Sequence, residues 1–148
     1  MRGNGFRTNK SPYVYASPLE FISPSSEHLP LNSVLKQGST MGGRVGLMTG
    51  TTYATPDFIS ASDVAAGSSA STIPVIRVKS DIELIVPQAS SATVVSTTNI
   101  GNHVACCTSM TCVDTATTGV FVISGIYNTS AAAAQYFTGH FIAAGTTI

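Results

Sequence analysis

Three cysteines and a histidine lie close together in the chain and form its most reactive grouping: His103, Cys106, Cys107 and Cys112. Thiolate and imidazole are the usual ligands of zinc, so these residues could form a metal site. Zinc knuckles, however, leave two to four residues between paired cysteines, and adjacent residues of a strand point to opposite faces of a sheet. We therefore expect the cysteines to be buried, reduced thiols, and the sequence predicts no metal and no cofactor.

Nucleophilic catalysis requires a thiol or hydroxyl, a base beside it and a third group that orients the base. No assignable companion stands beside His28, His103 or His140 in the sequence. The Gly-x-Ser-x-Gly motif is absent, and the glycine-rich segment 38–44 (GSTMGGR) lacks the Gly-Lys-Ser/Thr of a phosphate-binding loop. We expect these glycines to form a turn, and we predict that the protein is not an enzyme.

Four charged residues alternate with apolar residues in the most regular pattern of the chain: Arg77, Lys79, Asp81 and Glu83. A single strand across this segment would place every charge on one face. Asp81 and Glu83 would then share a face, as the carboxylates of a hydrolase do, but two cations share it too. Such a face is commonly solvated or guards a sheet edge. The sharper prediction is an intersubunit strip of ion pairs.

The overall composition indicates which elements carry these residues. Ser and Thr make up 38 of the 148 residues, and Val and Ile are frequent, whereas Glu, Lys, Arg and Gln are scarce. These proportions favour β-structure. Charged residues amount to 9% with a formal net charge of zero, so the chain has no field to attract nucleic acid. Its apolar runs are too short for a membrane helix, and residues 1–10 lack the apolar run of a signal peptide.

The first 33 residues differ from the rest of the chain in the spacing of their prolines and in their lack of a sustained apolar period. Pro12, Pro18, Pro24 and Pro30 recur at intervals of six, which predicts an extended arm without a backbone ladder of its own. Its apolar side chains need a cover, and we expect a partner protein to supply it. The residues expected to bind that partner are Tyr13, Tyr15, Leu19, Phe21 and Ile22. The alternative is that the arm lies along its own domain.

Residues 34–148 read as a β body of short strands separated by turns. Strands are expected around Val45, around Phe58, over 74–84, and over 93–98, 103–108, 120–127 and 135–143. Only 131–134 (AAAA) could begin a helical turn. No helix-length segment separates the strands, so the predicted fold is all-β, a small antiparallel barrel or sandwich.

The C-terminal half carries almost no charge, because Asp114 is the only residue with a formal charge at pH 7 between Leu84 and Ile148, with His counted as neutral. Either Ser and Thr form its solvent face, or part of it is buried against other copies of the chain. We expect the second in part, since closure by symmetry also covers exposed sheet edges. The sequence thus predicts a homo-oligomer.

The neutral chain, its Pro-rich arm and its Gly-, Ala-, Ser- and Thr-rich body together resemble the head decoration, or cement, proteins of tailed bacteriophages. The segments that look most like that family are 42–47 (GGRVGL), 73–76 (IPVI) and 139–145 (GHFIAAG). The resemblance implies a β-barrel or β-tulip protein, commonly trimeric, made in the host cytoplasm and located on the capsid exterior. It also implies a structural role, the clamping of neighbouring major capsid subunits.

In this interpretation the arm binds the capsid, and removing residues 1–33 should leave a folded body that no longer binds. Two other interpretations remain. The chain could be another virion component, of the tail or neck. It could also be a carbohydrate- or receptor-binding module of a fibre or adhesin, for which Tyr127, Asn128 and Tyr136 are the available grouping.

Overall fold

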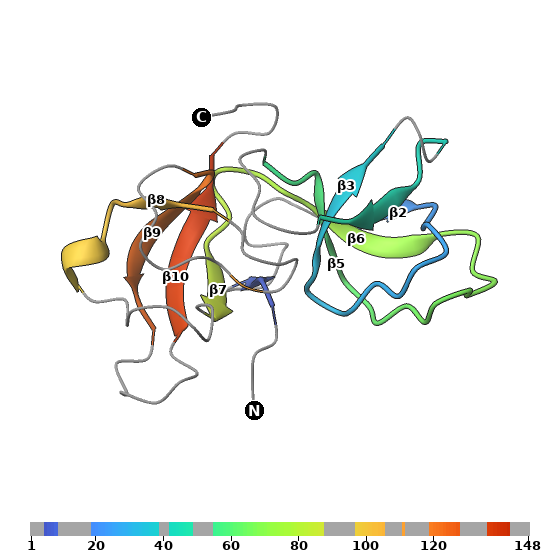
Figure 1. Ribbon diagram of the computed structural model, residues 1–148, viewed down its shortest axis with the longest axis horizontal. Coiled ribbons are helices and arrows are strands. Elements are labelled where there is room, and N and C mark those ends of the chain that lie inside the picture. The colour runs from blue at the N-terminus through green and yellow to red at the C-terminus, as the bar shows by residue number, and fades with distance from the viewer. Residues whose placement is uncertain are drawn as a thin grey trace.

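The computed structural model describes residues 5–8, 19–38, 42–48, 55–87, 97–105, 111, 119–127 and 136–142, which form two antiparallel β-sheets of five strands each (Figure 1). The predicted all-β class is confirmed. The sheets are not closed into a barrel, consistent with the sandwich alternative. In this described part of the chain, no helix has the length and hydrophobicity needed to cross a lipid bilayer.

Sheet 1 has the strand order β1-β7-β10-β9-β8. Its strands are β1 (Arg7–Thr8), β7 (Leu84–Pro87), β8 (His103–Val104), β9 (Phe121–Ile126) and β10 (Tyr136–Phe141). Along β10, buried and half-buried residues alternate, because successive side chains point to opposite faces of the sheet. The strands predicted over 120–127 and 135–143 are therefore confirmed as β9 and β10.

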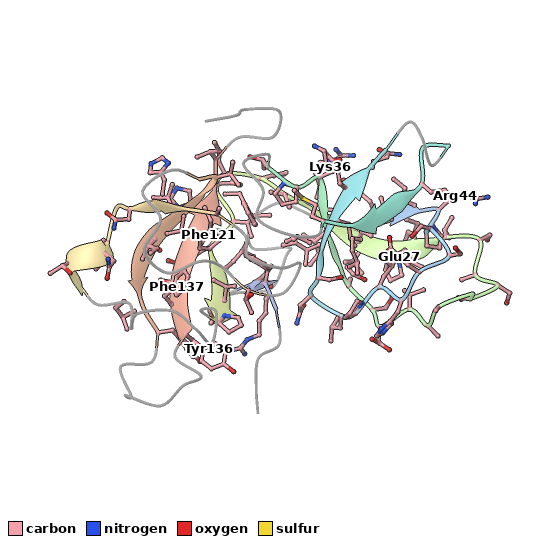
Figure 2. The ribbon with its side chains drawn as sticks, in the orientation of Figure 1. Glu27, Lys36, Arg44, Phe121, Tyr136 and Phe137 are labelled. Carbon is pink, nitrogen blue, oxygen red and sulfur yellow. The ribbon has the colours of Figure 1, made fainter. Side chains whose placement is uncertain are left out.

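Four phenylalanines form the centre of the core against sheet 1: Phe6, Phe121, Phe137 and Phe141 (Figure 2 labels two of them). The rings of Phe121 and Phe141 meet edge to face with centroids 5.0 Å apart, and those of Phe6 and Phe121 with centroids 5.8 Å apart. Gly139 leaves room for this packing. A Cβ there would lie 2.2 Å from the Val122 carbonyl oxygen and 2.4 Å from the Phe121 ring.

Sheet 2 has the strand order β2-β6-β5-β3-β4. Its strands are β2 (Glu20–Ile22), β3 (Val34–Gln37), β4 (Val45–Leu47), β5 (Phe58–Ser60) and β6 (Ile73–Arg77). All three residues of β5 are buried, so sheet 2 is covered on both faces. Val34 and Ile59 join the aromatic core of sheet 1, whereas Leu35 and Phe58 belong to a second cluster with Leu29.

The chain crosses from sheet 2 to sheet 1 between β6 and β7, and this corrects the prediction of one strand over 74–84. Strand β6 ends at Arg77, and a turn follows in which the Ile82 N–H donates to the Lys79 carbonyl at 3.3 Å. Ser80 and Asp81, at the centre of this turn, are typical turn residues. Because Val78 and Ile82 are both buried in the shared core, the segment bends inward from both ends.

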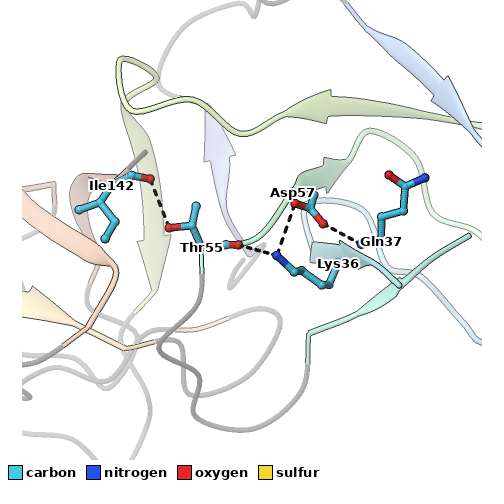
Figure 3. Close-up of polar contacts among 5 residues, drawn as sticks. All are labelled: Lys36, Gln37, Thr55, Asp57 and Ile142. Carbon is cyan, nitrogen blue, oxygen red and sulfur yellow. Dashed lines mark hydrogen bonds and ion pairs between the residues drawn. The ribbon is translucent and has the colours of Figure 1, made fainter. Parts of the chain in front are cut away.

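A second contact between the sheets runs through Thr55, which is buried (Figure 3). Its hydroxyl donates to the Ile142 carbonyl at 3.3 Å, just beyond the end of β10. Its own carbonyl accepts a hydrogen bond from the Lys36 ammonium, which also lies 3.5 Å from Asp57. Asp57 in turn accepts the Gln37 N–H at 2.8 Å. This chain of polar contacts ties the start of β5 to both sheets.

The described residues of the predicted arm 1–33 lie within this fold. Phe6 is fully buried in the aromatic core, and its N–H donates to the Asn32 carbonyl at 2.9 Å. Leu29 is also fully buried and exchanges two backbone hydrogen bonds of 2.9 Å with Val64. A truncation of residues 1–33 would thus remove two core side chains and the strands β1 and β2. Whether residues 34–148 fold without this segment stays a prediction, and the burial of Phe6 and Leu29 predicts a loss of stability.

Some predicted elements fall partly outside the described residues. Of the strand predicted over 93–98, only Thr97 and Thr98 are described, and they lie in a 3-10 helix, Thr97–Asn99, so that end of the prediction is wrong. Of the strand predicted over 103–108, residues 103–105 are described, and His103 and Val104 form β8. The helical turn considered at 131–134 lies outside the described residues, as do all three cysteines.

Candidate functional site

Strand β2 is the outermost strand of sheet 2, and its position is set by its pairing with β6. Glu20 pairs with Val75, Phe21 with Pro74 and Ile22 with Ile73. Pro74 has no N–H, and its carbonyl accepts a hydrogen bond from Ala61, on the side of β6 away from β2. Phe21 and Pro74 are therefore a non-hydrogen-bonded pair, and the N–H and carbonyl of Phe21 face away from β6. Within the described residues, no backbone partner binds them.

The side chains along this strand make an apolar edge. Phe21 is 68% exposed and Leu19, two residues earlier, is 39% exposed. Because alternate residues of an extended chain share a face, Leu19 and Phe21 lie on the same side. Most exposed strand edges carry charges or are covered, since an apolar edge invites pairing with another chain. We call Leu19, Phe21 and the outward backbone of β2 the β2 edge.

An ion pair on the other face fixes β2 to its neighbour. Both carboxylate oxygens of Glu20 accept hydrogen bonds from the Arg77 guanidinium, at 2.7 and 2.8 Å. The guanidinium also lies 4.9 Å from the centroid of the Phe58 ring. The hydrogen bonds from Arg77 and its charge hold the pKa of Glu20 below the ordinary value, and the same contact raises the pKa of Arg77. A two-pronged pair of this kind sets the relative orientation of the two side chains, and it links β2 to β6.

The predicted partner-binding residues divide into three groups. Leu19 and Phe21 are exposed at the β2 edge. Ile22 is half-buried and packs inward against the cluster of Leu29 and Phe58, so it is not part of that edge. Tyr13 and Tyr15 lie outside the described residues. Their role in binding a partner stays a prediction.

The predicted intersubunit strip is not a single face. Arg77 ends β6 in sheet 2 and pairs with Glu20 of the same chain. Lys79 and Asp81 lie in the connecting turn, and Glu83 accepts a hydrogen bond from Ser124 in sheet 1 at 3.1 Å. The alternation of charges was misleading because the strand ends after Arg77. Whether these residues contact another subunit stays a prediction.

The residues considered for chemistry form no complete catalytic or metal centre in the part of the chain that is described. His28 has a partner that sequence reasoning missed, since its Nε2 lies 2.9 Å from the Asp63 carboxylate, but both side chains are more than half exposed. No three described His, Cys, Asp or Glu residues lie close enough together to hold a metal ion. The contact between His28 and Asp63 can order the two segments that carry these residues, and it contains no nucleophile.

In the grouping considered for sugar binding, the two tyrosines lie near Arg7, and their role in binding a sugar stays a prediction. The Arg7 guanidinium lies 5.7 Å from the centroid of the Tyr127 ring and 6.0 Å from that of Tyr136. Asn128 lies outside the described residues. Both distances are within the range of a cation–π contact, and Tyr127 is still 54% exposed.

Sequence reasoning also missed a polar hollow beside β4. It measures about 390 Å³ and is lined by Ser23, Pro24, Ser25, Ser26, Arg44, Ser68, Ala70 and Ser71. These residues come from three segments separated in the chain. No local pattern in the sequence could have assembled them.

Comparison of the sequence with protein-family models gives no match, and comparison with curated proteins gives no significant match either. The functional assignment therefore depends on the geometry described above.

Proposed function

We propose that this protein is a structural subunit that attaches to other protein subunits through its β2 edge, as a head decoration protein attaches to a bacteriophage capsid. The supporting observation is the edge itself, an outermost strand that exposes Phe21 and Leu19 and directs the Phe21 backbone outward. An extended segment of the major capsid protein would add to β2 as a further strand, with backbone hydrogen bonds giving affinity and the two apolar side chains giving specificity.

The proposed attachment differs from that of a detached arm. Phe6 and Leu29 are fully buried, so part of the described N-terminal segment serves the fold, and the β2 edge is the part of it that we assign to a partner. This lowers the cost of binding, because β2 is already ordered and little backbone entropy is lost. The role is mechanical and requires no cofactor.

The attachment of a single subunit would be weak. Full burial of a phenylalanine side chain contributes about 1.5–3 kcal/mol, so covering the exposed two-thirds of Phe21 contributes about 1–2 kcal/mol. A homotrimer would engage several capsid sites at once, and the second and third contacts then form at high effective concentration. The low charge of the C-terminal half supports such an oligomer.

The test is co-sedimentation of the purified chain with capsids assembled from the major capsid protein encoded in the same genome. The wild-type chain should pellet with the capsids, and the double variant Leu19→Ser/Phe21→Ser should bind at least about tenfold more weakly. Ile100→Ser is the matched control, because Ile100 is also an exposed apolar residue but lies in a turn beyond the 3-10 helix.

Two results would contradict the proposal. Failure of the wild-type chain to bind these capsids rejects the decoration role. Equal binding by the wild type, the double variant and the control rejects the β2 edge as the attachment surface. Circular dichroism of each variant shows whether the fold is retained.

A further inference from the structure

The hollow beside β4 is held together by backbone hydrogen bonds among the three segments that line it. The Val45 N–H donates to the Ser23 carbonyl at 3.0 Å, and the Ser25 N–H donates to the Val45 carbonyl at 2.8 Å. On the opposite wall, the Gly67 N–H donates to the Ser26 carbonyl at 2.7 Å. The walls are thereby fixed before any ligand arrives, which lowers the entropic cost of binding.

Arg44 is the only charged residue among those that line the hollow. Its backbone is anchored at the base of the β3–β4 hairpin, where its carbonyl accepts the Gly38 N–H at 3.3 Å. Gly42 and Gly43 precede it with φ values of 65° and 80°, a conformation that favours glycine, and so they form the turn that presents Arg44. Its side chain is exposed at the end of the molecule away from sheet 1 (Figure 2).

The Arg44 guanidinium has no carboxylate partner within the described residues, unlike Arg77 and Lys36. The nearest acidic residue along the neighbouring segment, Glu27, is engaged elsewhere. One oxygen of its carboxylate accepts the Leu47 N–H at 3.0 Å and the Ser25 hydroxyl at 3.1 Å. Arg44 is therefore available for an external anion, to which a guanidinium can donate two parallel hydrogen bonds.

Serine hydroxyls supply the remaining polar groups. Among the five serines of the hollow, Ser68 already accepts the Ala70 N–H and Ser25 donates to Glu27. Ser23, Ser26 and Ser71 make no side-chain hydrogen bond within the described residues, so their hydroxyls can bind a ligand. A hydroxyl both donates and accepts, and it thus matches the hydroxyls of a sugar. The volume of about 390 Å³ falls in the range of small-ligand sites.

We propose that this hollow binds an anionic saccharide, a sugar whose sulfate or carboxylate group pairs with Arg44 while its hydroxyls bind the free serines. This goes beyond the attachment role and does not depend on it. The hollow lies along the outer side of β4 and begins at Ser23, the residue that follows β2, whereas the β2 edge is formed by Leu19 and Phe21 earlier in the same segment.

The test is a titration of the full-length chain, followed by NMR, with a sulfated disaccharide, its desulfated counterpart and inorganic sulfate in about 50 mM salt. The sulfated disaccharide should bind more tightly than either probe and should shift the resonances of residues 23–26 and 68–71. Arg44→Gln should weaken binding about tenfold or more. Lys79→Gln removes the same charge from the β6–β7 turn and should leave the affinity unchanged. Ser71→Ala should weaken binding of the disaccharide by a few-fold.

The opposite results would overturn the proposal. These are equal binding of the sulfated and desulfated sugars, equal affinity for inorganic sulfate alone, or equal losses in Arg44→Gln and Lys79→Gln, which would indicate only long-range attraction. Tighter binding of a glutamate-rich peptide than of the disaccharide would assign the hollow to a protein partner instead. A lack of capsid binding would leave this result unaffected, so the two proposals fail separately.

Discussion

Replacement of Phe6 by alanine should destabilise the whole fold, although Phe6 lies in the segment whose sequence resembles a free arm. Phe6 is 0% exposed and its ring lies 5.8 Å from Phe121 and 5.4 Å from Phe141, measured between centroids. Truncation of a buried phenylalanine to alanine costs about 3–5 kcal/mol. For a chain of this size, about 4 kcal/mol corresponds to a fall in Tm of roughly 8–16 °C. That is a large share of the roughly 5–15 kcal/mol that stabilises a typical domain.

The measurement is urea unfolding followed by far-ultraviolet circular dichroism and tyrosine fluorescence, since the chain has no tryptophan. Phe6→Ala should lower the midpoint with little change in slope. Leu31→Ala is the control, because Leu31 is 47% exposed and its loss should cost less than about 1 kcal/mol. A Phe6→Ala variant as stable as the control would show that the N-terminal segment is not part of the core.

Two further changes test the local geometry. Gly139→Ala should lower the free energy of unfolding in urea by about 1–3 kcal/mol, because the added Cβ would clash with the Val122 carbonyl and the Phe121 ring. An unchanged unfolding midpoint would contradict the close approach of β9 and β10. Glu20→Gln tests the ion pair with Arg77. Because the pKa of Glu20 is lowered in the folded state, the pair stabilises the protein at pH values above the ordinary pKa of 4.5. This stabilisation is lost as the pH falls through the lowered pKa. The pair is partly exposed, so the difference in unfolding free energy between wild type and Glu20→Gln should be at most about 1 kcal/mol at pH 7 and should vanish once the pH is well below the lowered pKa of Glu20. A difference that persists at the lower pH would assign the effect of Glu20 to something other than its charge.

The strands that the sequence predicts best are those with one buried face. In β10, Phe137 and Phe141 alternate with Thr138 and His140, and that period of two indicates a strand whatever the rest of the chain does. The short strand β5, expected around Phe58, is predicted from its apolar residues and the turn before it and not from alternation, because Phe58 and Ile59 are buried on opposite faces.

The charged segment 77–83 shows the limit of periodicity. Alternating residues predict one strand, yet Ser80 and Asp81 form a turn, and the neighbours Val78 and Ile82 are buried together in the shared core. The choice between strand and turn depends on where the two sheets meet. That relation is long-range and is not encoded in the local pattern.

The N-terminal segment shows a related limit of local patterns. The expectation of an extended chain without a ladder is wrong for Glu20–Ile22, which pair with β6, and the residues around Pro24 lie along β4 through the hydrogen bonds of Val45. Proline spacing predicts an extended chain but does not say what that chain covers. Burial of Phe6 and Leu29 depends on the β body, so only the structure shows it. Arg44 and the serines of the hollow were missed because three distant segments bring them together.

Cryo-electron microscopy of capsids assembled with this chain tests the proposed attachment most directly. We expect density for a strand of the major capsid protein beside β2, with Phe21 covered at the contact. Particles in which the chain is bound but the β2 edge faces solvent would contradict the account, as would capsids that carry no density for the chain at all.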